Sequence, residues 1–320
     1  MMKKNQFTLN NFIWLLLIVV IFALIGVLIS LGIIDGVYET LLMTVGINII
    51  LAISLNLIIG ITGQFSLGHA GFMSVGAYAA GVFIKHYGQG PSTFYFGLLA
   101  GMILSALVSL VIAIPTLRLR GDYLAIATLG FGEIIKIIMQ NAKITNGAAG
   151  LILPKLVDWK VIFIFVVLST LVVLSIRYSR YGRACISVRE NEIASEAMGI
   201  NTTKYKVLVF VIGAMLASVA GSLYAGSFFV IKPDMFSFNK SIDILVLVVF
   251  GGMGSFTGSF LSSFLIGLLN TTLQQFSDIR TILYGALLVI IMIFRPQGLL
   301  GTKEFSLRTI TDKLGKKVDK

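Results

Sequence analysis

The stretch FYFGLLAGMILSALVSLVIAIPTL (residues 94–117) carries no charged side chain, and FIWLLLIVVIFALIGVLISL (residues 12–31) has the same character. About 20 helical residues, each rising roughly 1.5 Å, cross the hydrocarbon core of a bilayer. Because that core holds no water, the backbone must satisfy its own hydrogen bonds, and continuous apolar runs without strand alternation do so as helices. These stretches predict an all-α, polytopic integral membrane protein.

The composition of the whole chain agrees with this fold class. Of the 320 residues, 57% are hydrophobic and 12% are charged, which lies outside the range of soluble globular proteins. We expect about ten transmembrane helices, some of them broken by glycine. Their expected positions are residues 12–32, 41–60, 65–84, 94–117, 122–140, 160–176, 206–230, 241–254, 256–276 and 280–294.

The net charge of +11 is explained by membrane topology. Most of the basic residues fall at the N-terminus, in loops between alternate spans and beyond the last span. The positive-inside rule then places both termini in the cytoplasm. We therefore expect a lipid bilayer around the chain and no nucleic-acid partner.

The expected organisation is a single transmembrane domain over residues 1–300 and a basic cytoplasmic tail over residues 301–320. The longest cytoplasmic segment between spans is at about 177–205, and the longest extracytoplasmic loop is at about 141–159. Neither is long enough to fold as a separate domain. We expect the function to lie within the bilayer and at its two faces.

Two hydrophobic segments are interrupted by glycine clusters with Ser or Thr nearby: GITGQFSLGHAGFMSVGAY (60–78) and VFGGMGSFTGSFLSSFLIG (249–267). Irregular backbone at membrane depth survives only beside protein or water, so paired breaks of this kind are typical of a transport pathway. Alternatively, small residues simply allow helices to pack closely. The residues leave both readings open. The pathway candidates are Asn56, Gln64, Ser66, Gly68, His69, Gly251, Gly252, Gly254 and Ser255.

A helix that starts near Gly63 to Gly68 would also present free backbone N–H groups to a substrate carboxylate. Gln64, Ser66 and His69 would be costly if they faced lipid, so we expect them to face other helices or water.

Glu133 and Lys136 are charged residues within the predicted span 122–140. Their i, i+3 spacing places them on one helical face and permits an ion pair. Intramembrane charges often mark function, but a pair close to the outer surface, with Lys136 reaching toward water, would be structural. We favour the structural pair.

Six fragments, in order along nearly the whole chain, resemble permease subunits of the ABC transporters for branched-chain amino acids, the LivM/LivH family. The LivM type fits better because of RGDYLAIATL and the closing RPQGLLG. The fragments are GQFSLGHAGFMSVGAYAAG (63–81), RLRGDYLAIATLGFGEI (118–134), TNGAAGL (145–151), SRYGRACISVRENEIASEAMGINTTKYK (179–206), IKPDMFSFNKSIDILVLVVFGGMGSFTGSF (231–260) and FRPQGLLG (294–301).

The resemblance implies an importer of leucine, isoleucine and valine in the bacterial cytoplasmic membrane. Its partners would be a second, LivH-like permease, two cytoplasmic ABC ATPase subunits and an extracytoplasmic amino-acid-binding protein. The chain lacks a G-x-x-x-x-G-K-[ST] phosphate loop, so ATP hydrolysis would belong to the partners. We expect no enzyme activity, no catalytic residues, no metal site and no bound cofactor.

The stretch RENEIASEAMGI (189–200) is short and rich in helix formers, with Ile193, Ala197 and Ile200 at helical spacing. Gly199 would end the helix. The resemblance implies that this helix docks in a groove on the ATPase; otherwise it is an ordinary solvated loop helix. The candidate coupling residues are Arg189, Glu190, Glu192, Ile193, Ala194, Ser195, Glu196, Ala197 and Gly199.

The family's E-A-A signature reads Ile-Ala-Ser at residues 193–195 when Gly199 is the anchor, so its glutamate is missing. Glu192 or Glu196 would have to replace it. Two rival functions remain: a permease of the same family for urea or short amides, and an ion-coupled secondary transporter or channel that needs no ATPase.

Overall fold

The computed structural model describes residues 2–32, 34–116, 119, 121–273, 285–286, 289, 293, 297–301 and 304. Most of the predicted span 280–294 and of the predicted tail 301–320 lies outside these residues. The elements are α1 Met2–Ser30, α2 Gly36–Asn56, the π-helix η1 Leu57–Ile61, α3 His69–Tyr87, α4 Pro91–Thr116, α5 Asp122–Asn141, η2 Gly147–Ala149, β1 Leu151–Ile152, α6 Trp159–Tyr178, α7 Arg180–Glu190, α8 Glu192–Ala197, α9 Thr202–Ser227, β2 Val230–Ile231, η3 Pro233–Phe236, α10 Phe238–Gly251 and α11 Phe256–Thr272.

The chain divides into two compact units. One contains α1 and the start of α2 up to Leu42, and the other begins at Met43 and contains the remaining helices. In the first, α1 covers the predicted span 12–32, and its apolar side chains, such as Leu24 and Val27, are exposed.

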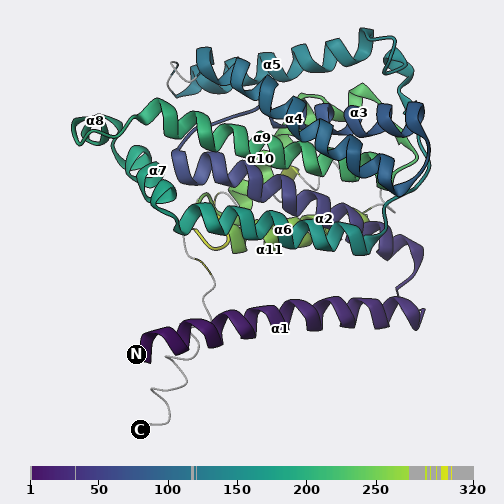
Figure 1. Cartoon of the computed structure of the whole chain (residues 1–320), viewed down its shortest axis with the longest axis horizontal. Helices are drawn as coiled ribbons and strands as arrows, with labels where there is room; N and C mark the ends of the chain where they lie inside the picture. The colour runs from purple at the N-terminus through teal and green to yellow at the C-terminus, as the bar shows by residue number, and fades with distance from the viewer. Residues whose placement is uncertain are drawn as a thin grey trace. The chain divides into compact units, whose positions relative to one another are not determined.

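The second unit is a helix bundle in which α3 packs against α4 and α9 (Figure 1). Small residues allow these backbones to approach closely. A Cβ added at Gly76 of α3 would overlap the Ser218 carbonyl of α9, and one added at Gly221 of α9 would overlap the Met73 carbonyl of α3. The close-packing interpretation of the glycines therefore holds for the body of α3.

Four of the described helices are long and apolar enough to cross a membrane: Gly36–Ile61, Pro91–Thr116, Trp159–Tyr178 and Thr202–Ser227. A fifth span is possible if α10 and α11 count as one, because they are joined by a 120° bend. The helices predicted at 241–254 and 256–276 are therefore a bent pair rather than two full spans. The total of about ten spans stays a prediction.

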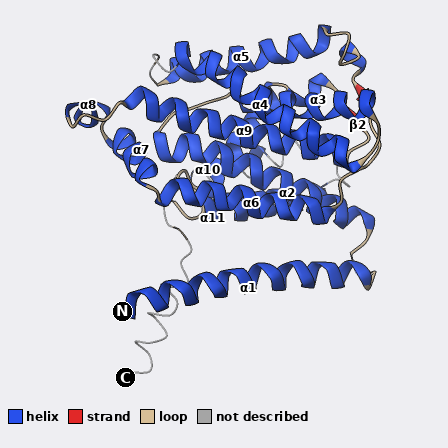
Figure 2. Cartoon of the chain, viewed as in Figure 1, coloured by secondary structure: helices blue, strands red, loops and turns tan. Residues whose placement is uncertain are grey.

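The two ends of the bundle are built differently (Figure 2). At one end, the short strands β1 and β2 pair antiparallel, with Leu151 opposite Ile231. This pairing joins the predicted loop 141–159 to the segment before α10. Helices α7 and α8, within the predicted segment 177–205, lie at the other end.

Candidate functional site

The first helix break separates α2 from α3. Helix α2 widens into the π-helix Leu57–Ile61, a form that often occurs at functional sites. Residues 63–68 are then irregular, and α3 begins at His69 rather than at 65 as predicted. Gly63 has a φ of 71°, a conformation that favours glycine.

The second break separates α10 from α11. Gly252 and Gly254 have φ values of 116° and 96°, so a side chain at either position would be strained. The chain then enters α11 through Ser255, whose Oγ accepts a hydrogen bond of 3.0 Å from the Gly258 N–H. This serine is an N-cap, which satisfies a donor that the helix itself leaves free.

Asn56 connects the two breaks. Its side chain is fully buried, and its Oδ1 accepts a 2.7 Å hydrogen bond from the Gly254 N–H. Its Nδ2 donates to the Ser255 carbonyl and to the Ser259 Oγ, both at 2.9 Å, and lies 3.4 Å from the Gly252 carbonyl. The irregular backbone of the second break is thus paired by a side chain from the first. Four of the predicted pathway residues meet at this point.

The polar side chains of the first break are buried: Gln64 is 3% exposed, Ser66 2% and His69 0%. The His69 Nε2 lies 2.7 Å from the Ser54 Oγ of α2. Within the described part of the chain, both side-chain polar atoms of Gln64, the Ser66 Oγ and the His69 Nδ1 have no hydrogen-bond partner. Native proteins rarely leave such atoms unpaired, so they are candidates to bind water or a solute.

The N-terminus of α3 is less open than the sequence suggested. The Ala70 N–H donates to the Ser241 Oγ of α10 at 3.2 Å, and the Gly71 N–H donates to the Gly68 carbonyl at 3.0 Å. These two amides are therefore not available to a substrate carboxylate in this conformation.

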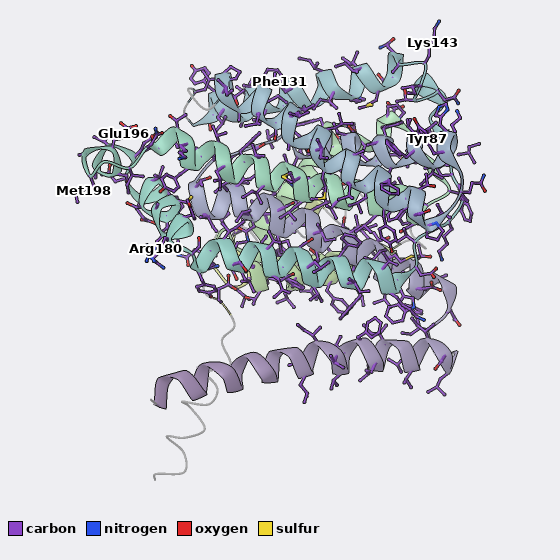
Figure 3. The ribbon with its side chains drawn as sticks, viewed as in Figure 1. Tyr87, Phe131, Lys143, Arg180, Glu196 and Met198 are labelled. Atoms are coloured by element: carbon purple, nitrogen blue, oxygen red, sulfur yellow. The ribbon has the colours of Figure 1, made fainter. Side chains whose placement is uncertain are left out.

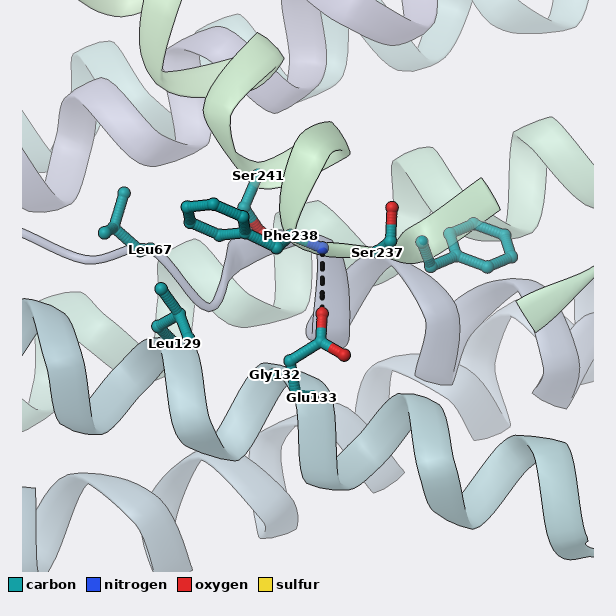
Figure 4. A pocket seen from close by; sticks show the side chains of 8 residues that line it. Leu67, Leu129, Gly132, Glu133, Ser237, Phe238 and Ser241 are labelled. Carbon is teal, nitrogen blue, oxygen red and sulfur yellow. Dashed lines mark hydrogen bonds between the residues drawn. The ribbon is translucent and has the colours of Figure 1, made fainter. Parts of the chain in front are cut away.

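A pocket lies beside the first break and against α5 and α10 (Figure 4). Glu133, halfway along α5, contributes to its wall: its Oε1 accepts from the Phe238 N–H at 2.9 Å, and its Oε2 accepts from the Lys136 Nζ at 3.2 Å. The carboxylate thus caps the N-terminus of α10, which is a structural role. The pocket is lined by Leu67, Leu129, Gly132, Glu133, Phe236, Ser237, Phe238 and Ser241.

The predicted coupling stretch 189–200 is divided between two helices. Arg189 and Glu190 end α7, and Asn191 then adopts an extended conformation and caps α8, its Oδ1 accepting from the Ala194 N–H at 3.0 Å. Gly199, with a φ of 83°, ends the segment, and its N–H donates to the Glu196 carbonyl at 2.9 Å.

The segment of α8 is bound to α7 by a buried serine and exposes two large apolar side chains. Ser195 is buried and its Oγ lies 2.8 Å from the Ser187 Oγ of α7, whereas Ile193 is 72% and Met198 82% exposed. Met198 points away from the bundle at the tip of this segment (Figure 3).

Glu192 and Glu196, the two candidates for the missing signature glutamate, both bind α9. The Glu192 Oε1 pairs with the Lys206 Nζ at 2.6 Å, and the Glu196 Oε1 accepts from the Thr202 Oγ1 at 2.7 Å.

Two arginines connect this end of the bundle to the breaks. The Arg189 Nη1 donates to the Gly60 carbonyl at 2.5 Å, and the Arg177 Nη1 donates to the Gly254 carbonyl at 2.9 Å. Arg189 is one of the predicted coupling residues, whereas Arg177 is not among the residues predicted from the sequence. An arginine at the end of an apolar run is so common that its sequence position gives no indication of an inward contact.

Glycine-broken helices that meet inside an apolar bundle are the architecture of a transporter. The chain belongs to the family described as the permease component of branched-chain amino acid transport systems, whose family model matches residues 37–294.

Among its relatives are high-affinity branched-chain amino acid transport permeases. LivM of Salmonella typhimurium is 36% identical over 266 residues, and LivM of Escherichia coli is 35% identical over 265. Each match covers 72% of this chain, and the chain spans 62% of the length of these relatives. LivH of Escherichia coli is 32% identical over 161 residues, which are 50% of this chain and 51% of LivH. No solved structure matches the chain.

Proposed function

We propose that this chain is a LivM-like permease subunit of a binding-protein-dependent ABC importer for leucine, isoleucine and valine. Its partners are a LivH-like permease, two cytoplasmic ATPases that hydrolyse ATP, and an extracytoplasmic amino-acid-binding protein. The chain itself binds no cofactor and catalyses no reaction. It lies in the bacterial cytoplasmic membrane with about ten spans and both termini inside. Residues 1–300 are the permease domain and 301–320 a basic tail.

The observation that carries this proposal is the meeting of the two breaks through Asn56. A lipid-facing break would expose backbone groups that cannot be hydrogen-bonded there, so a chain keeps one only where protein or a polar path surrounds it. The unpartnered atoms of Gln64, Ser66 and His69 lie at the first break. They supply a polar lining that close packing alone does not require.

The α7–α8 end is the proposed contact with the ATPases. Ile193 and Met198 are large apolar side chains with exposed fractions of 72% and 82% on a short, capped segment. Outside the bilayer, such side chains indicate a protein contact. An exposed helix of this kind fits the helix-in-groove mode of recognition. The opposite end, with β1 and β2, then faces the binding protein.

Uptake tests the proposal directly. The chain is reconstituted in liposomes with a LivH-like permease, the two ATPases and the binding protein of its own organism, and radiolabelled leucine is followed with and without ATP. We expect accumulation only with ATP and all partners present. Accumulation by this chain alone under an ion gradient would overturn the proposal, and urea displacing leucine from the binding protein would reassign the substrate.

Copurification tests the contact with the ATPases. Met198→Asp places a charge on the proposed docking surface and is expected to reduce ATPase recovery at least tenfold, because a buried unpaired charge is costly at an interface. Ile152→Asp is the matched control, since Ile152 is also 82% exposed but belongs to β1 at the other end. Equal ATPase recovery with both variants would contradict the assignment.

A further inference from the structure

Arg189 completes the C-terminal cap of the first broken helix. At the end of η1, the Thr62 N–H bonds to the Ile58 and Ile59 carbonyls, and the Gly63 N–H also bonds to Ile59 at 3.0 Å. The next carbonyl, that of Gly60, accepts instead from the Arg189 Nη1 at 2.5 Å. A cation at a helix C-terminus is favoured because carbonyl groups gather there.

Arg177 holds the second break in a related way. It lies in the last turn of α6, and its Nη1 donates to the Gly254 carbonyl at 2.9 Å. Its guanidinium also lies 5.3 Å from the centre of the Phe256 ring at the start of α11, within the range of a cation–π contact. Both backbone polar groups of Gly254 are thus bound, because Asn56 accepts from its N–H and Arg177 donates to its carbonyl.

The two arginine contacts act on one joint, which is the backbone contact between Gly60 of the first break and Gly254 of the second. An added Cβ at Gly60 would lie 2.6 Å from the Gly254 nitrogen and 2.7 Å from its Cα, so the two breaks are in direct backbone contact. One arginine therefore binds each side of the contact between Gly60 and Gly254. Both arginines come from the continuous segment that runs from the end of α6 through α7 to the proposed docking helix α8.

Arg189 also has a second partner that faces outward. Its Nη2 lies 2.6 Å from the Glu190 Oε1, and the Glu190 side chain is 66% exposed. A cationic partner that binds Glu190 would therefore compete with the Arg189 guanidinium, which also holds the Gly60 carbonyl.

We propose that Arg177 and Arg189 are positioning residues that transmit movement of the α7–α8 segment to the joint between the two helix breaks. Both hydrogen bonds are intact in this conformation and hold the joint closed. Movement of α7 draws the guanidinium of Arg189 from the Gly60 carbonyl and loosens the backbone at 57–68. The link to ATP hydrolysis rests on the proposed function, whereas the holding of the joint does not.

Hydrogen–deuterium exchange on the full chain in detergent tests the holding role without any partner. Arg189→Gln and Arg177→Gln are expected to raise amide exchange about tenfold at 57–68 and 251–258 respectively, because local opening becomes easier. The amides of α4 should not change. Arg180→Gln is the matched control: it removes the same charge from α7, where Arg180 is exposed and points outward (Figure 3). Unchanged exchange in both Arg189→Gln and Arg177→Gln would overturn the proposal.

The assembled transporter tests the transmitting role. With Arg189→Gln we expect about fivefold more ATP hydrolysed per leucine imported, both counted per ATPase recovered in the complex, at the low end of allosteric coupling. Arg189→Lys keeps the charge and a hydrogen-bond donor, so it should bring the number of ATP hydrolysed per leucine part of the way back to the wild-type value. A proportional fall in hydrolysis and uptake would indicate a merely structural role and contradict the proposal. If wild-type protein imports no leucine, the proposed function fails while the exchange experiment still decides the holding role.

Discussion

The break between α2 and α3 and the break between α10 and α11 both depend on glycines with positive φ, but their polar groups differ. At the second break, Ser255 caps α11, and Ser262 donates to the Leu247 carbonyl at 2.6 Å. At the first, Gln64 and Ser66 are just as buried but have no partner within the described residues. The polar groups of the second break are therefore paired within the protein, whereas those of the first break are suited to bind water or a solute.

Removing the link between the breaks should have the largest effect. Asn56→Leu leaves the Gly254 N–H buried without its partner, which costs about 1–3 kcal/mol, and also removes the hydrogen bonds from Asn56 to the Ser255 carbonyl and the Ser259 Oγ. We expect a loss of about 3 kcal/mol in the free energy of unfolding in detergent, together with loss of uptake. Asn141→Leu, at an exposed position bonded only to the Ile137 carbonyl among the contacts described, is the control. Equal losses of stability in both variants would contradict the role of Asn56 as the link between the two breaks.

Forcing the two breaks apart should cost somewhat less. Gly60→Ala pushes a methyl group against the Asn56 Oδ1 and the Gly254 backbone, and overpacking of this kind costs about 1–3 kcal/mol. Gly130→Ala provides the comparison, because an added Cβ there meets nothing within 4 Å. Thermal unfolding of the two variants measures the difference. A Gly60→Ala protein as stable as Gly130→Ala would mean that the breaks are not in tight contact.

Removing one polar side chain at a time should distinguish the second break from the first by its effects on stability and uptake. Ser262→Ala removes a 2.6 Å hydrogen bond and should lower the free energy of unfolding by about 1 kcal/mol with little effect on uptake. Gln64→Leu replaces a buried amide that has no described hydrogen bond, so the free energy of unfolding should not fall while uptake does. The reverse pattern would exchange the roles of the two breaks.

Thiol labelling should give the smallest signal. In the assembled transporter during turnover, Ser66→Cys should react with a water-soluble thiol reagent and Ser259→Cys should not, although both serines are buried here, at 2% and 0% exposure. The native Cys185 of α7 should react little below pH 9, because burial raises the pKa of its thiol to about 11 and only the thiolate attacks. Labelling of Ser66→Cys as low as that of Ser259→Cys would show that the first break does not open.

The sequence was most informative where hydrophobic runs end at polar or charged residues. The stretches predicted at 122–140 and 160–176 are the helices α5, Asp122–Asn141, and α6, Trp159–Tyr178, and α6 is one of the four helices long and apolar enough to cross a membrane. Spans 241–254 and 256–276 were misjudged because composition does not reveal a bend. The glycines indicated where the helices break, but the pairing of Asn56 with Gly254 joins residues far apart in the chain, which no local pattern reports.

In the coupling stretch, the sequence contains a helix start signal that the prediction did not use. Asn191 directly before Glu192 is a typical N-cap, and it separates Arg189 and Glu190, which end α7, from α8. The inward contacts of Arg177 and Arg189 had no such signal, because either side chain is long enough to reach protein or solvent.

The backbone contact of α3 with α9 at Gly76 and Gly221 has a mechanical consequence. With carbonyl groups of each helix lying against glycines of the other, neither helix can slide or rotate past its neighbour without a collision. Helices α3 and α9 must therefore move together as one rigid body, and conformational change has to be concentrated at the hinges around them.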